Sequence, residues 1–195
     1  DGSVKEYAES KSVYEIALDI SEGLARVACC AKVDGKVVDL RTVIDSDCEL
    51  AICTANDEEG LATIRHTTSH VMAEAVKKLF PEAKLAIGPS IDTGFYYDFE
   101  HEPFSREDLD AIEAEMKKII KNGAKLEKFT MPREEAIKFM EEKQEPYKVE
   151  LAEGIPDGEE ISFYIIYYNG LFCNFQLLID GMLVKSKRKT TDLSR

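Results

Sequence analysis

The sequence predicts an α+β chain of two domains, a small mixed sheet with one helix followed by a unit built around a long helix. The pair Asp34-Gly35 lies between apolar residues, which is typical of a tight β-hairpin. Apolar residues recur at helical spacing between about residues 58 and 80, while residues 161–168 are apolar and aromatic, as in a strand. We place the boundary at an acidic junction, so that the predicted domains span residues 1–56 and 57–195.

The first domain is predicted from four short signals. Residues 3–7 alternate like a strand, and Ser12 and Glu15 have the spacing of a capping box. The capping box predicts a short helix that Gly23 ends. Its predicted apolar face consists of Val13, Ile16, Ala17 and Ile20. The hairpin at residues 33–37 and a strand at 49–53 complete a small mixed sheet with a helix on one face.

The second domain opens with the long helix, from about Glu58 to Phe80, capped by Asp57 and ended by Pro81. Its predicted core stripe consists of Leu61, Ile64, Thr68, Met72, Ala75 and Leu79. Two further helices are predicted over residues 106–122, after a Ser105–Asp108 capping box, and over about 132–142. Predicted strands or strand edges are residues 84–89, 94–99 and 161–168.

Charge and cysteine content limit the function classes. The net charge of -13 excludes nucleic-acid binding through the overall field, so any RNA contact must be local. The five cysteines are odd in number and form no CxxC pair, which argues against a disulfide framework or a four-thiolate zinc site and favours the cytoplasm. Residues 1–10 are polar and unlike a signal peptide, and no apolar run predicts a membrane span.

The strongest candidates for chemistry are His66 and His70, one helical turn apart on one face of the long helix. At 100° per residue they fall opposite the predicted core stripe, next to the small side chain of Ala73. Such a pair suits metal binding or acid–base catalysis, and it is equally the pattern of two solvated histidines. We assign no metal ligand. The third histidine, His101, lies in an acidic loop, where we expect a surface residue.

A second candidate segment is residues 94–98, in which aromatic rings and a carboxylate follow a glycine. Strand alternation predicts that Tyr96 and Asp98 point to one side and Phe95 and Tyr97 to the other. Ordinary sheet and core residues would have the same pattern. Neither phosphate-binding glycine motif occurs, so the chain is a poor candidate for ATP chemistry on its own.

Three motifs give the chain a family resemblance. Residues 64–70 (IRHTTSH), 84–89 (KLAIGP) and 94–98 (GFYYD) resemble the editing domain of bacterial threonyl-tRNA synthetases, and residues 145–149 (EPYKV) fit the same pattern. The first predicted domain, residues 1–56, resembles the TGS domain that precedes the editing domain in this family. This likeness implies a β-grasp, ubiquitin-like fold. Together the likeness covers about residues 1–164.

The resemblance implies a function and the residues that perform it. Editing domains of this family hydrolyse serine wrongly attached to threonine tRNA, because one methyl group gives too little selectivity in a single pocket. It implies catalytic roles for His66, His70 and Lys148, and substrate contacts for Tyr96, Tyr97 and Asp98. Threonine tRNA is the expected partner and no cofactor is expected here. ATP, zinc and homodimer contacts would belong to a synthetase core.

The resemblance stops after Tyr164. The family continues with an Asp-x-Cys-x-Gly-Pro-His element. An ungapped count places Cys173 at the family cysteine, which makes it a fourth candidate catalytic residue, but puts Leu171 and Leu177 at the aspartate and histidine. The part from about residue 165 is therefore atypical, through divergence or a shifted reading frame. The basic cluster at 185–189 suits either a phosphate backbone or a solvated tail.

Two other functions remain open from the sequence. Certain TGS-bearing nucleoside kinases, similar to uridine kinases, share this front end, so the chain would then be an accessory region that binds a nucleotide or RNA. A non-catalytic RNA-binding module is the third alternative.

Overall fold

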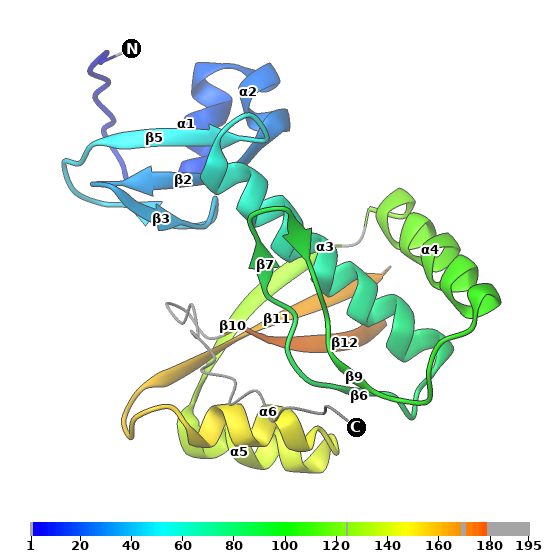
Figure 1. Ribbon diagram of the computed structural model, residues 1–195. Coiled ribbons are helices and arrows are strands. Elements are labelled where there is room, and N and C mark those ends of the chain that lie inside the picture. The colour runs from blue at the N-terminus through cyan, green and yellow to red at the C-terminus, as the bar shows by residue number, and fades with distance from the viewer. Residues whose placement is uncertain (1, 124, 169–170, 179–195) are drawn as a thin grey trace. The chain divides into compact units, whose positions relative to one another are not determined.

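The computed structural model describes residues 2–123, 125–168 and 171–178 (Figure 1). They form two compact units, the first made of residues up to 73 with 87–98, and the second of residues 74–86 with those from 99 onward. Within the described ranges all strand pairs are antiparallel. The predicted α+β class, with a long helix and antiparallel sheets, is confirmed.

The first unit begins with a sheet centred on β2 (Ala28–Val33), which pairs with β3 (Lys36–Val38) and with β5 (Leu50–Thr54). The predicted hairpin is confirmed. Asp34 and Gly35 both have positive φ, 50° and 79°, as a type I′ turn requires. A second pair joins β1 (Lys11–Ser12) to β4 (Val43–Ile44).

The helix after β1 starts as predicted but ends earlier. Ser12 and Glu15 form the complete capping box of α1 (Val13–Ile20). Gly23 does not end it, because Ser21 both closes α1 and caps a second helix, α2 (Glu22–Val27), in which Gly23 lies. The Ser21 hydroxyl accepts the Leu24 N–H, and this short-range capping bond outweighs the weak helix propensity of glycine. Ile20, predicted on the apolar face, is exposed.

The strand predicted at residues 3–7 is wrong. This segment has no regular structure, and Val4 is 89% exposed. Alternation alone is insufficient here, because a strand needs a partner for its backbone groups, and these residues have no ladder partner among the described residues.

The long helix α3 (Glu58–Leu79) has nearly the predicted bounds. Asp57 precedes it, but its carboxylate accepts the backbone N–H and the hydroxyl of Thr54. The carbonyl of Asp57 accepts the Leu61 N–H, the first intrahelical bond. Asp57 therefore ties the end of β5 to the start of α3.

The predicted core stripe of α3 is confirmed only in part, because Ala75 is buried but the three large aliphatic side chains are not. Leu61, Ile64 and Leu79 are 37–38% exposed, whereas Ser69, Ala73 and Val76 are 0–1% exposed. These three buried residues also follow helical spacing, but two of them are too small or too polar to stand out in a hydrophobic pattern. The histidine face is thus buried rather than turned away from the core.

Four short strands follow α3: β6 (Lys84–Leu85), β7 (Ser90–Ile91), β8 (Gly94–Phe95) and β9 (Phe99–Glu100). In the first unit β7 pairs with β8, and in the second unit β6 pairs with β9. Residues 94–99 are therefore not one continuous strand, although the Tyr96 and Asp98 N–H groups donate to the Pro89 and Ile87 carbonyls and so continue the pairing of β7 with β8.

The second unit contains α4 (Arg106–Lys121), with the predicted capping box of Ser105 and Asp108 and the predicted end at Gly123, which has φ 62°. Its sheet has the order β10–β11–β12 (Lys125–Pro132, Glu160–Tyr168, Leu171–Leu178). Helices α5 (Arg133–Glu142) and α6 (Pro146–Glu153) pack on each other beside it (Figure 1). The core of this layer consists of Ala136, Met140, Ala152, Ile155, Ile161 and Phe163.

Three of these elements, β10, β12 and α6, lack a sequence prediction. Residues 125–132 (KLEKFTMP) have three charged residues among the first four, and Pro146 starts α6 at its first position, where proline is favoured. Among the described helices, none combines the length and apolarity that a bilayer span requires. The basic cluster at 185–189 lies outside the described residues.

Candidate functional site

The two histidines of α3 are in direct contact in the first unit. Nε2 of His66 lies 3.1 Å from Nε2 of His70, and the rings meet edge to face at 78° with centroids 4.5 Å apart. At this distance one nitrogen donates a proton and the other accepts it. His70 is 5% exposed, so the alternative interpretation of two solvated histidines is wrong.

Burial also sets the ionisation of this pair. Loss of water lowers the pKa of His66 below its ordinary value of 6.5. A neutral imidazole is therefore favoured at neutral pH, and a neutral imidazole can accept a proton from water. The arrangement has the chemistry of a general base whose partner ring stabilises one tautomer.

The turn that carries the histidines is tied to residues 87–98 of the same unit (Figure 1). The Ser69 hydroxyl lies 2.7 Å from the His66 carbonyl oxygen and 2.9 Å from that of Gly88. The Arg65 guanidinium donates to the Ile91 carbonyl at 3.4 Å. Ser69 lies between the histidines in sequence and is fully buried, and as a small polar residue on a helix it carries no sequence signal for this role.

The aromatic segment lies on this loop. The Tyr97 ring packs so closely on Gly88 that an added Cβ would lie 2.1 Å from Cδ2 of the ring. The Asp98 N–H donates to the Ile87 carbonyl at 2.9 Å, and Tyr96 is 39% exposed. Gly88 is therefore required by the ring of Tyr97, and Tyr96 presents the more accessible hydroxyl.

Lys148 belongs to the second unit, on the first turn of α6, and is 2% exposed. Burial lowers the pKa of its amino group to about 8, with a raising contribution from Glu145 and a lowering one from Lys77. An amine with this pKa changes charge near neutral pH, which is typical of functional lysines.

Cys173 lies on β12, and its side chain is outside what the structure describes. Within the described ranges, no three His, Cys, Asp or Glu side chains are arranged to hold a metal ion.

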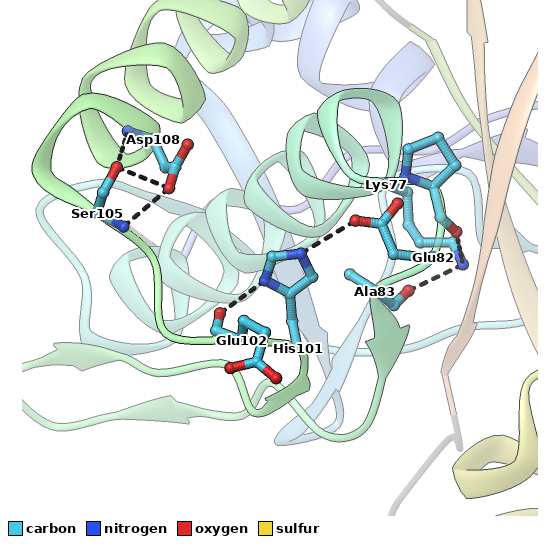
Figure 2. A network of polar contacts seen from close by, with 8 residues as sticks. Lys77, Glu82, Ala83, His101, Glu102, Ser105 and Asp108 are labelled. Carbon is cyan, nitrogen blue, oxygen red and sulfur yellow. Dashed lines mark hydrogen bonds and ion pairs between the residues drawn. The ribbon is translucent and has the colours of Figure 1, made fainter.

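His101 differs from its prediction as a surface residue. Its side chain is 15% exposed, and its ring stacks on Phe104 with centroids 4.8 Å apart. As Figure 2 shows, its nitrogens also contact the Glu102 carbonyl and the Glu82 carboxylate. The aromatic residues around it cover the ring, so it serves as part of a local cluster.

Two buried charged groups of the second unit also lack a sequence prediction. Glu145 is 4% exposed and forms an ion pair with Lys77 at 3.0 Å. Glu74 is 3% exposed, and burial raises the pKa of its carboxyl group to about 7. Neither stands out in sequence, because charged residues on helices are ordinarily solvated.

Comparison with known proteins shows which proteins the chain is similar to. Residues 1–54 match the model of the TGS domain family, a β-grasp module. The chain is 61% identical over 165 residues to a threonine–tRNA ligase of Acetivibrio thermocellus. It is 59% identical to those of Caldanaerobacter subterraneus over 165 residues and of Clostridium botulinum over 167.

These alignments cover 84–85% of the chain but only 26% of each relative, so the chain spans about a quarter of the length of the ligases it matches. The match of a TGS domain and of ligase sequence in one chain confirms the likeness to the synthetases: the chain corresponds to the N-terminal region of threonyl-tRNA synthetases.

Proposed function

We propose that this chain hydrolyses serine from wrongly charged threonine tRNA. The observation that carries the proposal is the buried His66–His70 pair, with its Nε2 atoms 3.1 Å apart and the pKa of His66 lowered by burial. The relatives are called threonine–tRNA ligases, which supports tRNA as the partner.

The proposed reaction is ester hydrolysis. A water oxygen attacks the carbonyl carbon of the seryl ester, and one histidine accepts the proton that the water loses. The carbonyl oxygen becomes an oxyanion, which hydrogen-bond donors or a positive charge must stabilise. The resemblance to the editing domains supports Lys148 as a further catalytic residue. The bond to the ribose oxygen then breaks, that oxygen takes the proton from the imidazolium, and serine and tRNA leave.

The substrate contacts are assigned to the aromatic loop. Tyr96 offers an exposed ring and hydroxyl, and Tyr97 and Asp98 are anchored by their contacts with Gly88 and Ile87. We propose that these residues bind the terminal adenosine or the seryl group. With a net charge of -13, the chain must contact RNA locally.

The test is deacylation of seryl-tRNA specific for threonine, followed as release of labelled serine. His66→Ala and His70→Ala should each lower the rate by ~10²–10⁴-fold, the usual contribution of general acid–base catalysis. His101→Ala is the matched control, because His101 is absent from the proposed mechanism and its nitrogens contact Glu82 and Glu102. Equal rates for wild type and both variants would refute the proposal.

A second candidate function is RNA binding without hydrolysis. The observation that favours it is the departure after Tyr164, where Leu171 and Leu177 replace the aspartate and histidine of the family element. In that case the chain binds threonine tRNA in a filter-binding assay while serine release stays at the uncatalysed rate.

A further inference from the structure

The environment of the Lys148 amino group is unusual for a positive charge. The group is buried in the second unit, and an ammonium ion without water is stable only beside compensating charge or hydrogen-bond acceptors. The groups that act on it electrostatically are Glu145 and Lys77. Of the other cations on adjoining elements, Lys84 of β6 pairs with Glu100, and Arg133 of α5 pairs with Asp157.

Glu145 connects Lys148 to the rest of the unit through both its backbone and its side chain. It precedes α6, and its carbonyl accepts the N–H groups of Lys148 at 3.0 Å and Val149 at 3.1 Å. One carboxylate oxygen, Oε1, contacts Lys77, and Oε2 accepts the Leu85 N–H at 3.3 Å. The first turn of α6 is thereby anchored to β6 and to the last turns of α3.

The amino group of Lys77 is also fixed by several contacts. Its Nζ lies 3.0 Å from Oε1 of Glu145, 3.2 Å from the Pro81 carbonyl and 3.0 Å from the Ala83 carbonyl. Figure 2 shows the contact with the Ala83 carbonyl. An ammonium group has three protons to donate, so these three acceptors satisfy it. Lys77 is therefore a fixed cation that neutralises the buried Glu145 carboxylate.

We propose that Lys77 and Glu145 are positioning residues that set the charge Lys148 carries during deacylation. The inference rests on the proposed function for the role of Lys148 in the reaction. The Glu145 carboxylate pairs with Lys77 and also acts electrostatically on Lys148. Removing Glu145 takes away a negative charge that favours the ammonium form of Lys148, whereas removing the charge of Lys77 takes away a positive charge that disfavours it.

The two removals must therefore act on Lys148 in opposite directions, which loss of structure alone would not produce. Glu145→Gln favours the neutral amine, and its amide oxygen can still accept the Leu85 N–H. Lys77→Met favours the ammonium form and keeps an unbranched side chain of similar length. Lys77→Arg keeps the charge and should behave like wild type.

The first measurement needs no tRNA. Lysine labelled with carbon-13 at Cε is incorporated into the full chain for NMR. The Lys148 signal is the one that is absent from the spectrum of Lys148→Arg. The chemical shift of this signal is then followed against pH. We expect the midpoint to fall by about 1 pH unit in Glu145→Gln and to rise by about 1 in Lys77→Met, as typical for loss of a close charge. Lys84→Met removes an exposed cation of the same unit and should leave it unchanged.

The second measurement is the pH profile of serine release from mischarged threonine tRNA. If the ammonium form is active, the rate falls as pH rises through the Lys148 midpoint, earlier in Glu145→Gln and later in Lys77→Met. Midpoints that stay fixed, or that move the same way in both variants, overturn the inference. If the midpoints move as expected while the wild type releases no serine, the proposed function fails and the charge relationship stands.

Discussion

His66 and His70 share one hydrogen bond between their Nε2 atoms, 3.1 Å apart, on consecutive turns of α3. The bond needs one protonated and one unprotonated nitrogen, so a second proton at this position would break it and place two cations side by side. The pair is thus built to accept and return a single proton, as the proposed hydrolysis requires. Its pH dependence follows directly.

We expect the stability of the chain to report the titration of His66. Its pKa in the folded chain lies below the ordinary 6.5, so in the pH range below 6.5 the unfolded chain binds more protons. The free energy of unfolding therefore rises with pH in that range, and the penalty disappears above it. His66→Gln cannot titrate and should lose less stability than wild type between pH 7.5 and pH 5.5 in urea unfolding. Parallel losses in the two proteins would contradict the lowered pKa.

Glu74 should have the opposite pH signature. Its carboxyl group is buried near Lys78 and Glu115, and Oε2 has no hydrogen-bond partner within the described part of the chain. With a pKa raised from 4.5 to about 7, the folded chain binds more protons than the unfolded chain between these values, so stability falls as pH rises through them.

Glu74→Gln should therefore be more stable than wild type by ~1–3 kcal/mol at pH 8 and gain little at pH 4.5. Chemical unfolding at the two pH values measures the difference. Glu141→Gln, at an exposed position of α5, is the matched control and should show no such pH-dependent gain. A gain in stability at pH 8 no larger than that of the control would contradict the raised pKa of Glu74.

Gly88 should be essential to the aromatic loop. Its added Cβ would overlap the Tyr97 ring at 2.1 Å, whereas a Cβ on Gly94, at the start of β8, meets nothing within 4 Å. Gly88→Ala must displace the ring and should lower serine release at least ~10-fold, as small displacements of substrate-binding groups do. Gly94→Ala should retain most activity in the same assay. Equal effects of the two substitutions would show that the loop tolerates movement of Tyr97.

Gly60 should be essential to the junction between β5 and α3. An added Cβ would lie 1.9 Å from the Thr54 carbonyl oxygen, so Gly60→Ala should lower the free energy of unfolding by ~1–3 kcal/mol through overpacking. Gly23 in α2 meets only the Ser21 hydroxyl at 3.8 Å, and Gly23→Ala should stabilise by ~0.5–1 kcal/mol through higher helix propensity. Thermal or urea unfolding distinguishes the two. Similar effects would mean that β5 and α3 separate at little cost.

Most of the elements that were predicted correctly depend on short sequence motifs. The capping boxes at Ser12 and Ser105 and the turn at Asp34-Gly35 depend on bonds or dihedral angles within four residues, and all three are confirmed. The strand predicted at residues 3–7 is wrong because pairing is not a local property. The helix end predicted at Gly23 is wrong because Ser21 caps a second helix that contains Gly23.

The sequence by itself determined the α+β class, the long helix, the histidine pair on one helical face and the likeness to threonyl-tRNA synthetases. These follow from spacing and motif, which need no knowledge of partners. Only the tertiary structure decided that the histidine face of α3 is buried and that Ser69 bonds to Gly88. It also decided that Glu145 pairs with Lys77, 68 residues before it in the chain (145 − 77), beside Lys148. Burial and long-range ion pairs depend on which segments meet, and small or charged residues carry no hydrophobic pattern that would reveal it.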